Sequence, residues 1–227
     1  MTSRGAGFRA IVFDLDGTLI DSRRDIATAV NAMRADLGLE PLSLERVVAM
    51  VGEGARVLVR RALGELAATL PPERMRAALA SYLAHYREVC LDTTRPYPGV
   101  PAMLAELAPS FPLAVLSNKG EALSRLILNR LGLDRYLREV VGGDTLPTRK
   151  PNPGGLIWLA DRLAVPAGEL LLVGDSPVDA ETARAAASPF ALVVWGSPRP
   201  PGADGVEAGW RFATPDELIT AFTGGQD

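Results

Sequence analysis

Cysteine, histidine and lysine are scarce in this chain of 227 residues. It has one Cys and one His, and only two of its 24 Lys and Arg side chains are Lys. The single cysteine, Cys90, excludes an intramolecular disulfide, so we expect a reducing compartment and a cytoplasmic protein. The single histidine, His85, excludes a metal site built from several histidines and leaves almost no room for a Ser-His-Asp triad. The chemistry of the chain must therefore come from other residues.

Long hydrophobic runs and a charge excess are also missing. No apolar stretch approaches the ~18 residues of a membrane helix, and the first residues lack the apolar core of a signal peptide. The 24 basic and 27 acidic side chains give a net charge of -3, whereas a nucleic-acid surface normally shows a basic excess. A hydrophobic content of 48% instead predicts a globular protein with a sizeable core. We expect neither a membrane nor a nucleic acid as a partner.

Five short apolar runs, rich in strand-forming residues, predict β-strands. They span residues 8–13, 112–116, 139–141, 170–173 and 191–195. Continuous apolar runs are typical of strands that are buried on both faces, as in a parallel sheet. Between the runs the apolar residues recur at helical spacing, as at Leu123, Leu126 and Leu131. The alternation of strands and helices predicts an α/β fold with a doubly wound parallel sheet.

Residues 21–92 break this alternation, because apolar residues recur there only at helical spacing. The predicted helices cover residues 22–37, 43–51 and 73–91. Ser22 and Ser43 are expected to cap the first two of them. We interpret residues 21–92 as a helical cap domain, inserted into an α/β core that is made of residues 1–20 and 93–227.

Two carboxylates follow the first predicted strand, where the sequence reads Asp14-Leu15-Asp16-Gly17-Thr18. Ligand sites in open α/β sheets lie beyond the carboxyl ends of the strands. In extended geometry Asp14 and Asp16 point to the same side about 6.6 Å apart, where two charges repel by roughly 2.5 kcal/mol. A divalent cation, or a proton on one carboxyl, relieves this repulsion, and both suit phosphoryl transfer. An ordinary polar turn explains the isolated motif about as well.

The ends of further predicted strands carry a hydroxyl, an amide, a lysine and two acids. Ser117 and Asn118 form a seat for a phosphate at a helix start, although a plain helix cap is the commoner reason for such residues. Lys150 precedes a proline in a chain that has arginine at 22 of its 24 Lys and Arg positions. This rarity favours contact with a phosphate over simple solvation. Asp175 suits a Mg²⁺ ligand with Asp179 steadying the site, or else caps the next helix.

All of these residues follow strands of the same predicted sheet, so we expect them to converge on one crevice. Each signal is ambiguous by itself. Independent helix caps would not be expected to supply paired carboxylates, a third acid, a hydroxyl and a lysine together. Their coincidence therefore favours a functional site.

The same residues resemble the sequence motifs of the haloacid dehalogenase superfamily of phosphatases. The six residues from Asp14 to Leu19 match the first motif of that superfamily. The remaining motifs are matched by Ser117-Asn118, by Lys150-Pro151, and by Gly174-Asp175-Ser176 with Asp179. The helical insert stands where this superfamily places its cap, so the resemblance covers essentially the whole chain. One departure is Ala187-Ser188, where the superfamily often has a glycine.

The resemblance implies that Asp14 is a nucleophile that forms an aspartyl-phosphate, and that Asp16 is a general acid and then a general base. It also implies a Mg²⁺ cofactor held by Asp14, the backbone carbonyl of Asp16 and Asp175, with Asp179 in the metal site.

The resemblance further implies that the transferred phosphate is bound by the first-motif loop and by the second and third motifs. Ser117, Asn118 and Lys150 would neutralise the phosphoryl oxygens. Gly17 and Thr18 would order the loop around the phosphate.

Within the superfamily the sequence looks most like phosphoglycolate phosphatases. The similar segments are Tyr97–Val100, Gly142–Asp144, Thr148–Pro153 and, in the predicted cap, Val51–Ala55. The resemblance implies a Mg²⁺-dependent phosphomonoester hydrolase that converts 2-phosphoglycolate to glycolate and phosphate. The partner would be a small phosphorylated metabolite, acted on by a monomer or homodimer.

Three alternatives remain at this stage. One is the same chemistry on another small phosphoester, such as a sugar phosphate, and another is a phosphomutase. The third is a catalytically silent phosphate-binding protein, which the intact motifs disfavour. Because a carboxylate substrate needs a cationic or N–H-rich receptor, we expect Arg56 or the Gly52-Glu53-Gly54 turn before it to bind the carboxylate.

Overall fold

A six-stranded parallel sheet forms the centre of the structure, a computed structural model that describes residues 7–196, 202 and 205–224. In spatial order its strands are β5 (Glu139–Val141), β4 (Leu113–Leu116), β1 (Ala10–Phe13), β6 (Leu170–Gly174), β7 (Phe190–Val193) and β8 (Trp210–Phe212). The five strands predicted from the sequence are confirmed, with ends that shift by one or two residues. The edge strand β8 was not predicted, because Trp210-Arg211-Phe212 is too short a run to stand out.

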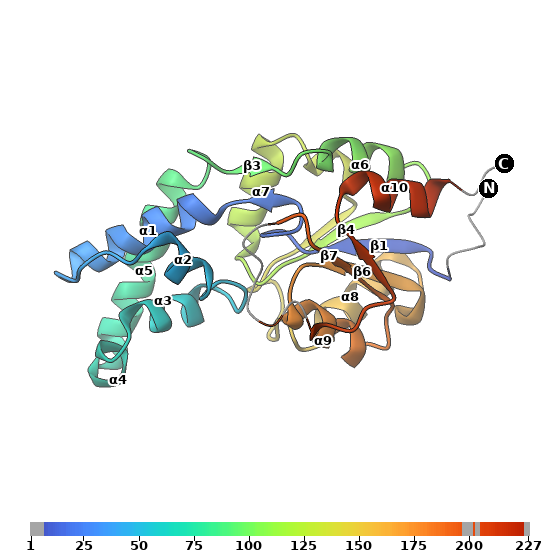
Figure 1. The fold of residues 1–227 in the computed structure, drawn as a ribbon. Coiled ribbons are helices and arrows are strands. Elements are labelled where there is room, and N and C mark those ends of the chain that lie inside the picture. The colour runs from blue at the N-terminus through green and yellow to red at the C-terminus, as the bar shows by residue number, and fades with distance from the viewer. Residues whose placement is uncertain (1–6, 197–201, 203–204, 225–227) are drawn as a thin grey trace.

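Alternate residues of each central strand pack on opposite faces of the sheet, which explains why the strands are apolar throughout. In β1, Ile11 and Phe13 belong to one buried cluster, whereas Ala10 and Val12 belong to the other. The first face is covered by α6 (Val100–Leu107), α7 (Glu121–Arg130) and α10 (Pro215–Thr223). The second face is covered by α8 (Gly154–Leu163) and α9 (Pro177–Ala185), below the sheet in Figure 1. The doubly wound α/β fold is thus confirmed.

The strand order places a topological switch point at β1. The chain runs from β1 through β4 to β5 on one side, and then returns to pair β6 with the other side of β1. Because all of these strands are parallel, β1, β4 and β6 end at the same edge of the sheet. Ligands of such folds bind at this edge, beside the switch point.

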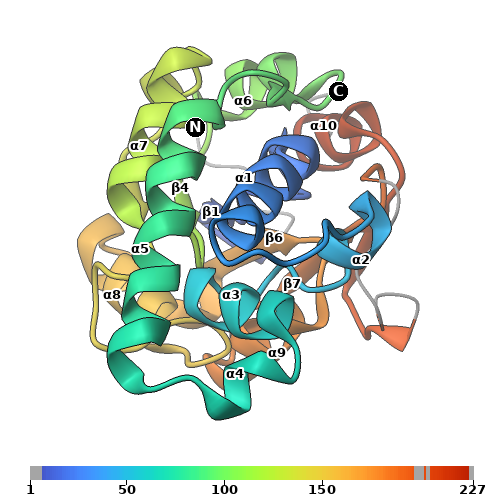
Figure 2. The same ribbon diagram turned by 90° about the vertical axis from the view of Figure 1, so that its left-hand side faces the viewer.

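A helical insert, defined here as α1 to α5, lies between β1 and β4 in the sequence. Its helices are α1 (Arg23–Asp36), α2 (Leu44–Val48), α3 (Ala55–Leu63), α4 (Leu66–Thr69) and α5 (Pro72–Val89). The long helices α1 and α5 pack against each other, and Figures 1 and 2 show the insert across the edge at which the central strands end. The short helices α3 and α4 were not predicted. We propose that residues 21–92 form a domain of their own.

A short antiparallel ladder and a buried carboxylate join the insert to the core. The ladder pairs β2 (Ile20–Asp21) with β3 (Arg95–Pro96). Asp25, on the first turn of α1, accepts hydrogen bonds from the backbone N–H groups of Thr93 and Thr94, at 3.0 and 2.8 Å, and from both hydroxyls. These donors satisfy the hydrogen-bonding capacity of the buried carboxylate. They also join the segment that enters the insert to the segment that leaves it.

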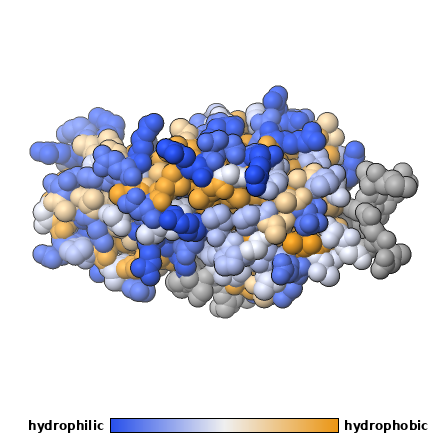
Figure 3. Space-filling view, turned by 90° about the horizontal axis from the view of Figure 1, so that it is seen from above, coloured by the Kyte–Doolittle hydropathy of each residue, from blue (hydrophilic) through white to orange (hydrophobic). Residues whose placement is uncertain are grey.

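The surface is mixed in hydropathy. Seen from above, hydrophobic residues gather near the middle, where the insert meets the core, and hydrophilic residues surround them (Figure 3). None of the helices in the described part of the chain is long and apolar enough to cross a membrane. Residues 1–6, where we expect no signal peptide, lie outside the described residues.

Candidate active site

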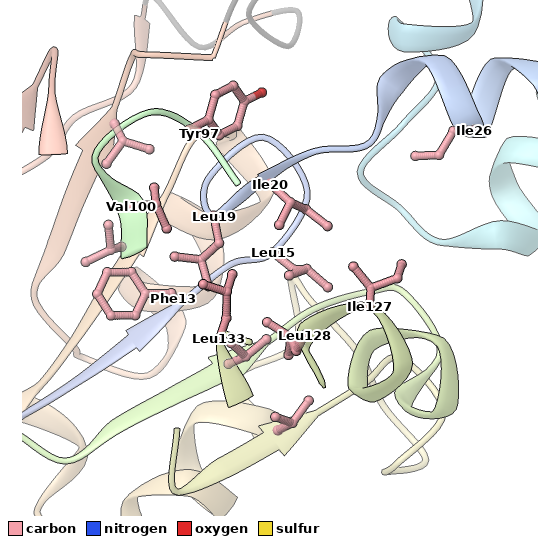
Figure 4. Packing of buried hydrophobic residues seen from close by; sticks show 14 of the residues in the cluster. Phe13, Leu15, Leu19, Ile20, Ile26, Tyr97, Val100, Ile127, Leu128 and Leu133 are labelled. Atoms are coloured by element: carbon pink, nitrogen blue, oxygen red, sulfur yellow. The ribbon is translucent and has the colours of Figure 1, made fainter. Parts of the chain in front are cut away.

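The loop after β1 is fixed by its own apolar residues. Leu15, Leu19 and Ile20 are fully buried, and Figure 4 shows them pointing into the cluster that α7 also lines. The backbone N–H groups of Leu19 and Ile20 both donate to the carbonyl of Leu15, at 2.9 and 3.0 Å. Asp14, Asp16 and Gly17, which lie before and between these apolar residues in the sequence, line a cavity between the core and the insert. Alternation of apolar and acidic residues therefore anchors the loop and presents its carboxylates.

Glycine is the only residue type that fits at position 17 of this loop. Its φ is +91°, a left-handed value that favours glycine. A Cβ atom built there would lie 2.2 Å from Oδ2 of Asp175. The glycine of the first motif therefore lets the loop pass directly over the carboxylate that follows β6.

Lys150 connects two carboxylates at the bottom of the site. Its Nζ donates to Oδ1 of Asp14 at 2.7 Å and to Oδ1 of Asp179 at 2.6 Å, and all three side chains are buried. Burial opposes the charge of Lys150, but the two carboxylates outweigh it and hold the pKa of this lysine above its usual value. Burial also raises the pKa of Asp14 to about 7, although Lys150 works in the opposite direction. In the sequence these residues follow three different predicted strands. The structure shows that they are in contact.

Asp175 stands beside this trio and forms no ion pair with any described residue. Burial, followed by the charges of Asp14 and Asp179, raises its pKa well above the usual range. Oxygen atoms of Asp14, Asp175 and Asp179 lie within 4.8 Å of one another. A hard divalent cation prefers such oxygen ligands and would offset their repulsion, so the donor set fits a metal ion.

Asp175 does not cap the helix that follows it. The N-cap of α9 is Ser176, whose hydroxyl accepts from the N–H of Asp179 in a capping box with Pro177 in the first turn. Asp179 thus has its Oδ1 on Lys150 and its Oδ2 on Ser176. The carboxylate of Asp175 lies near that of Asp14 instead. The role of a helix cap is therefore excluded for Asp175, and the role of a metal ligand remains.

Asp16 points away from the trio, toward the helical insert. Its Oδ1 accepts from the hydroxyl of Ser22 at 2.5 Å and from Nζ of Lys119 at 2.6 Å. Lys119 also donates to the hydroxyl of Tyr86 on α5, at 2.6 Å. Ser22 occupies the N-cap position of α1, but its side chain makes no capping bond, because its hydroxyl serves Asp16 instead. The Asp16 side chain is therefore not part of the cluster formed by the carboxylates of Asp14, Asp175 and Asp179.

Ser117 and Asn118 follow β4 on the other side of Asp14. Ser117 is buried, and its Oγ accepts from the N–H of Lys119 at 3.2 Å. The side-chain amide of Asn118 donates to the carbonyls of Lys150 and of Gly52, both at 2.9 Å. Asn118 therefore ties the loop that carries Lys150 to the glycine-rich turn of the insert.

Three predicted phosphate-binding residues do not line the cavity. One of them is Lys150, which stands behind the wall and is joined to it by its bond to Asp14. Thr18 is fully buried, with its hydroxyl unpartnered and its carbonyl accepting from the indole of Trp195 at 2.9 Å. This places Thr18 as support for the loop. Arg56 is exposed and is absent from the cavity wall, although Gly52 and Gly54 of the preceding turn lie in it. The structure therefore does not bring the Arg56 side chain to the site.

The rest of the cavity wall is mostly apolar. The empty space is about 1010 Å³, including its open mouth. The insert contributes Ile26, Val48, Val51, Leu58, Leu83 and the stacked pair Tyr82 and Tyr86. Lys119, Tyr86 and Ser22 were not predicted as site residues. The signal for Lys119 was its rarity, since the chain has only one other lysine.

Comparison with known proteins agrees with this geometry. The family model described as haloacid dehalogenase-like hydrolase matches residues 11–193. The chain belongs to this family. A protein of known structure, described as a predicted phosphoglycolate phosphatase from Haemophilus somnus, is 29% identical, with a TM-score of 0.88 over 96% of this chain and 99% of that one.

Two curated relatives are more similar in sequence to this chain than that protein is. A protein of Rhodospirillum rubrum is 42% identical over 85% of this chain and 82% of its own length, and is named phosphoglycolate phosphatase. A protein of Aquifex aeolicus with the same name is 39% identical over 83% of this chain and 85% of its own length. Both alignments span most of each protein.

Proposed function

We propose that this hydrolase is a Mg²⁺-dependent phosphatase that cleaves 2-phosphoglycolate to glycolate and phosphate through an aspartyl-phosphate on Asp14. The observation that carries the proposal is the different surroundings of two aspartates that stand two residues apart in the sequence. Asp14 is buried beside Lys150, Ser117 and Asp175, whereas Asp16 turns toward Ser22 and Lys119 on the side of the insert. These surroundings support an attack on phosphorus by Asp14 and proton transfer to the leaving group by Asp16.

Cationic and N–H donors surround the place where the phosphoryl group must sit. Lys150 holds one oxygen of Asp14, so the other oxygen is the one that attacks. The ammonium of Lys150, the hydroxyl of Ser117 and the backbone N–H of Asn118 are the proposed partners of the phosphoryl oxygens. Phosphoryl transfer depends mainly on such positioning and charge stabilisation, because little other covalent chemistry is needed.

In the first step, a carboxylate oxygen of Asp14 attacks phosphorus and the bond from phosphorus to the ester oxygen breaks. Asp16 supplies a proton to the departing oxygen, so that glycolate leaves with its hydroxyl restored. Lys119 and Ser22 donate to the same oxygen of Asp16, which holds its carboxyl group in place for this transfer. Asp14 then carries the phosphoryl group.

In the second step, water attacks phosphorus and the bond between phosphorus and the Asp14 oxygen breaks. Asp16 takes the proton of this water, which returns both aspartates to their starting states. The apolar wall of the insert excludes other water molecules from the site during the reaction.

The proposed cofactor is Mg²⁺, with the carboxylates of Asp14 and Asp175 and the backbone carbonyl of Asp16 as its protein ligands. When bound, such an ion supplies charge that screens the phosphoryl oxygens from the nucleophile. Asp179 is proposed to position Lys150 and to add negative charge, since both of its oxygens already accept hydrogen bonds.

The names of the relatives support 2-phosphoglycolate as the substrate. The direct test is the kcat/KM for 2-phosphoglycolate with MgCl₂, beside sugar phosphates, nucleotides and pyrophosphate. We expect a lead of at least about a hundredfold, roughly 2.7 kcal/mol of transition-state discrimination. A flat profile, or a lead for a sugar phosphate, would retain the mechanism and replace the substrate. Isomerised sugar phosphate without free phosphate would indicate a phosphomutase, and binding without turnover would indicate a silent protein.

A further inference from the structure

Arg23 has a buried nitrogen that no described residue uses. Its Nε and Nη2 donate to the two carboxylate oxygens of Asp21, at 2.7 and 2.5 Å. The third guanidinium nitrogen, Nη1, is shielded from solvent and has no hydrogen-bond partner. Because a buried donor without a partner carries a desolvation penalty with no compensating bond, such groups in native structures call for an explanation.

The location of Arg23 supplies one. Arg23 is the first residue of α1 and lines the same cavity as Asp14, Asp16 and Asp175. The preceding residue, Ser22, donates to the carboxylate of Asp16, the proposed proton donor to the leaving group. Arg23 therefore lies on the side of the cavity from which the leaving group departs, and not behind the phosphoryl group as Lys150 does.

The guanidinium is also held ready. Asp21 ends β2 and binds Arg23 through a two-bond fork, and this contact is the main reason that the pKa of Arg23 is raised above its usual value. A guanidinium that is fixed by one carboxylate loses little freedom when it binds a second oxygen. Asp21 thus orients Arg23 and leaves Nη1 as the free donor.

The other cation that lines this cavity is already engaged. Among the described residues that line this cavity, the cationic side chains are Arg23 and Lys119. Lys119 is bonded to Asp16 and Tyr86, and Arg61 pairs with Glu53 on the insert. Arg56 is exposed and outside the cavity wall.

We propose that Arg23 is a specificity-determining residue, whose Nη1 donates to the carboxylate of the substrate's leaving group. This inference rests on the proposed function and names the group that recognises the part of 2-phosphoglycolate that is not transferred. It replaces Arg56 as the cationic receptor.

The test compares two substrates that differ in that carboxylate. In 2-hydroxyethyl phosphate a neutral hydroxymethyl group stands in place of the carboxylate of 2-phosphoglycolate, and the phosphate ester is the same. We expect Arg23→Gln to lower kcat/KM for 2-phosphoglycolate by about 10- to 100-fold, as for a lost hydrogen bond to a charged group. The same variant should change kcat/KM for 2-hydroxyethyl phosphate by less than about threefold.

Two controls separate recognition from folding. Arg24→Gln alters the exposed neighbouring arginine and should leave both substrates unchanged. Inhibition by the product glycolate gives a readout that requires no turnover, and we expect its inhibition constant to rise in Arg23→Gln. An unchanged thermal unfolding curve would verify that the variant is folded.

Equal losses on both substrates, or no loss on either, would overturn the role of Arg23 while leaving 2-phosphoglycolate as the substrate. If the unaltered protein does not prefer 2-phosphoglycolate to 2-hydroxyethyl phosphate, the proposed function fails, and the role of Arg23 fails with it. The wild-type and variant measurements therefore distinguish the two failures.

Discussion

The strand ends and the helical insert line one cavity with opposite kinds of surface. The strand-end half carries the charged side chains of Asp14, Asp16, Lys119 and Asp175. Behind its wall, Lys150 is bonded to Asp14 and Asp179. The insert half is apolar apart from Arg23, Ser22 and the tyrosine hydroxyls. This difference fits the proposed function, which assigns the reaction to the strand ends and assigns exclusion of water and recognition of the leaving group to the insert.

Few polar contacts cross between the two halves inside the cavity. Lys119 on the core side donates to Tyr86 of α5, and Asn118 donates to the carbonyl of Gly52. These contacts, together with the hydrogen bonds from Thr93 and Thr94 to Asp25, join the insert to the core. We therefore expect substitutions at the strand ends to have large effects on catalysis. Substitutions at the contacts between the core and the insert should have smaller effects.

The largest effect on activity is expected when the proposed nucleophile, Asp14, is replaced. We expect Asp14→Asn to lower kcat by at least about 1,000-fold, because an amide cannot form the acyl-phosphate. The variant should stay folded, since it removes a charge from a buried cluster. Asp161→Asn, at an exposed position on α8, is the matched control and should retain full activity. Substantial metal-dependent turnover by purified Asp14→Asn would contradict the covalent mechanism.

The next largest effect is expected at the buried lysine. Lys150→Met leaves two buried carboxylates unpaired, so we expect a loss of about 3 kcal/mol in the free energy of unfolding and about 100-fold in kcat/KM. Lys150→Arg should not restore activity, because a planar fork cannot replace a point charge between Asp14 and Asp179. Chemical denaturation and steady-state kinetics measure the two effects. A smaller loss of stability in Lys150→Met than in Lys119→Met would contradict this ranking of the two lysines.

The third effect is a dependence of stability on pH and Mg²⁺. Burial raises the pKa of Asp14 to about 7 and that of Asp175 well above its usual value, whereas both titrate near 4 in the unfolded chain. The folded protein therefore binds more protons than the unfolded chain between these values, and metal-free stability must fall as pH rises through that window.

The measurement is the midpoint of thermal unfolding, with EDTA or with MgCl₂. We expect the metal-free midpoint to be several degrees lower at pH 8 than at pH 6, and Mg²⁺ to raise the midpoint more at pH 8. Asp175→Asn should remove most of the response to Mg²⁺. Equal responses to Mg²⁺ at the two pH values would contradict a metal site on these carboxylates.

A smaller effect is expected where the two halves of the cavity touch. Tyr86→Phe removes the hydroxyl that accepts from Lys119 and keeps the ring that stacks on Tyr82. We expect kcat/KM to fall about three- to tenfold, the cost of one hydrogen bond. Tyr82→Phe is the matched control, since no described residue bonds its hydroxyl, and it should lose less. If the two variants lose the same activity, the bond from Lys119 to Tyr86 contributes nothing.

The smallest effect lies outside the cavity, at the turn after α9. Ala187 has a φ of +52°, a left-handed conformation that favours glycine. We expect Ala187→Gly to raise the free energy of unfolding by about 0.5–1 kcal/mol, and Ala186→Gly, at an ordinary φ, to lower it. Activity should be unchanged in both variants. Stabilisation by Ala186→Gly would show that φ is not the cause.

The sequence was most informative where the backbone alone sets the geometry. Asp14, Ser117, Lys150 and Asp175 each follow a buried strand or a loop after one, and parallel strands that end at one edge bring such residues together. The apolar runs located these strands because each is packed on both faces. The fold and the meeting of the strand-end residues could therefore be predicted from local patterns.

Contacts between distant elements could not be predicted in this way. Nothing near Lys119 in the sequence reveals Tyr86, which lies 33 residues away on a helix of the insert. The hydroxyl of Ser22 has the sequence context of a helix cap, and only the fold shows that it serves Asp16. Arg56 follows a glycine-rich turn that reaches the cavity, but the direction of α3 carries its side chain into solvent.

The most direct test of the account is to trap the covalent intermediate. The protein would be mixed with 2-phosphoglycolate and MgCl₂, quenched in acid, and treated with borohydride, which reduces an aspartyl-phosphate to homoserine. Mass spectrometry of the peptide that contains Asp14 and Asp16 then identifies the modified position. The account predicts homoserine at position 14 alone, dependent on substrate. Modification at position 16, or none at either aspartate while turnover continues, would contradict Asp14 as the nucleophile.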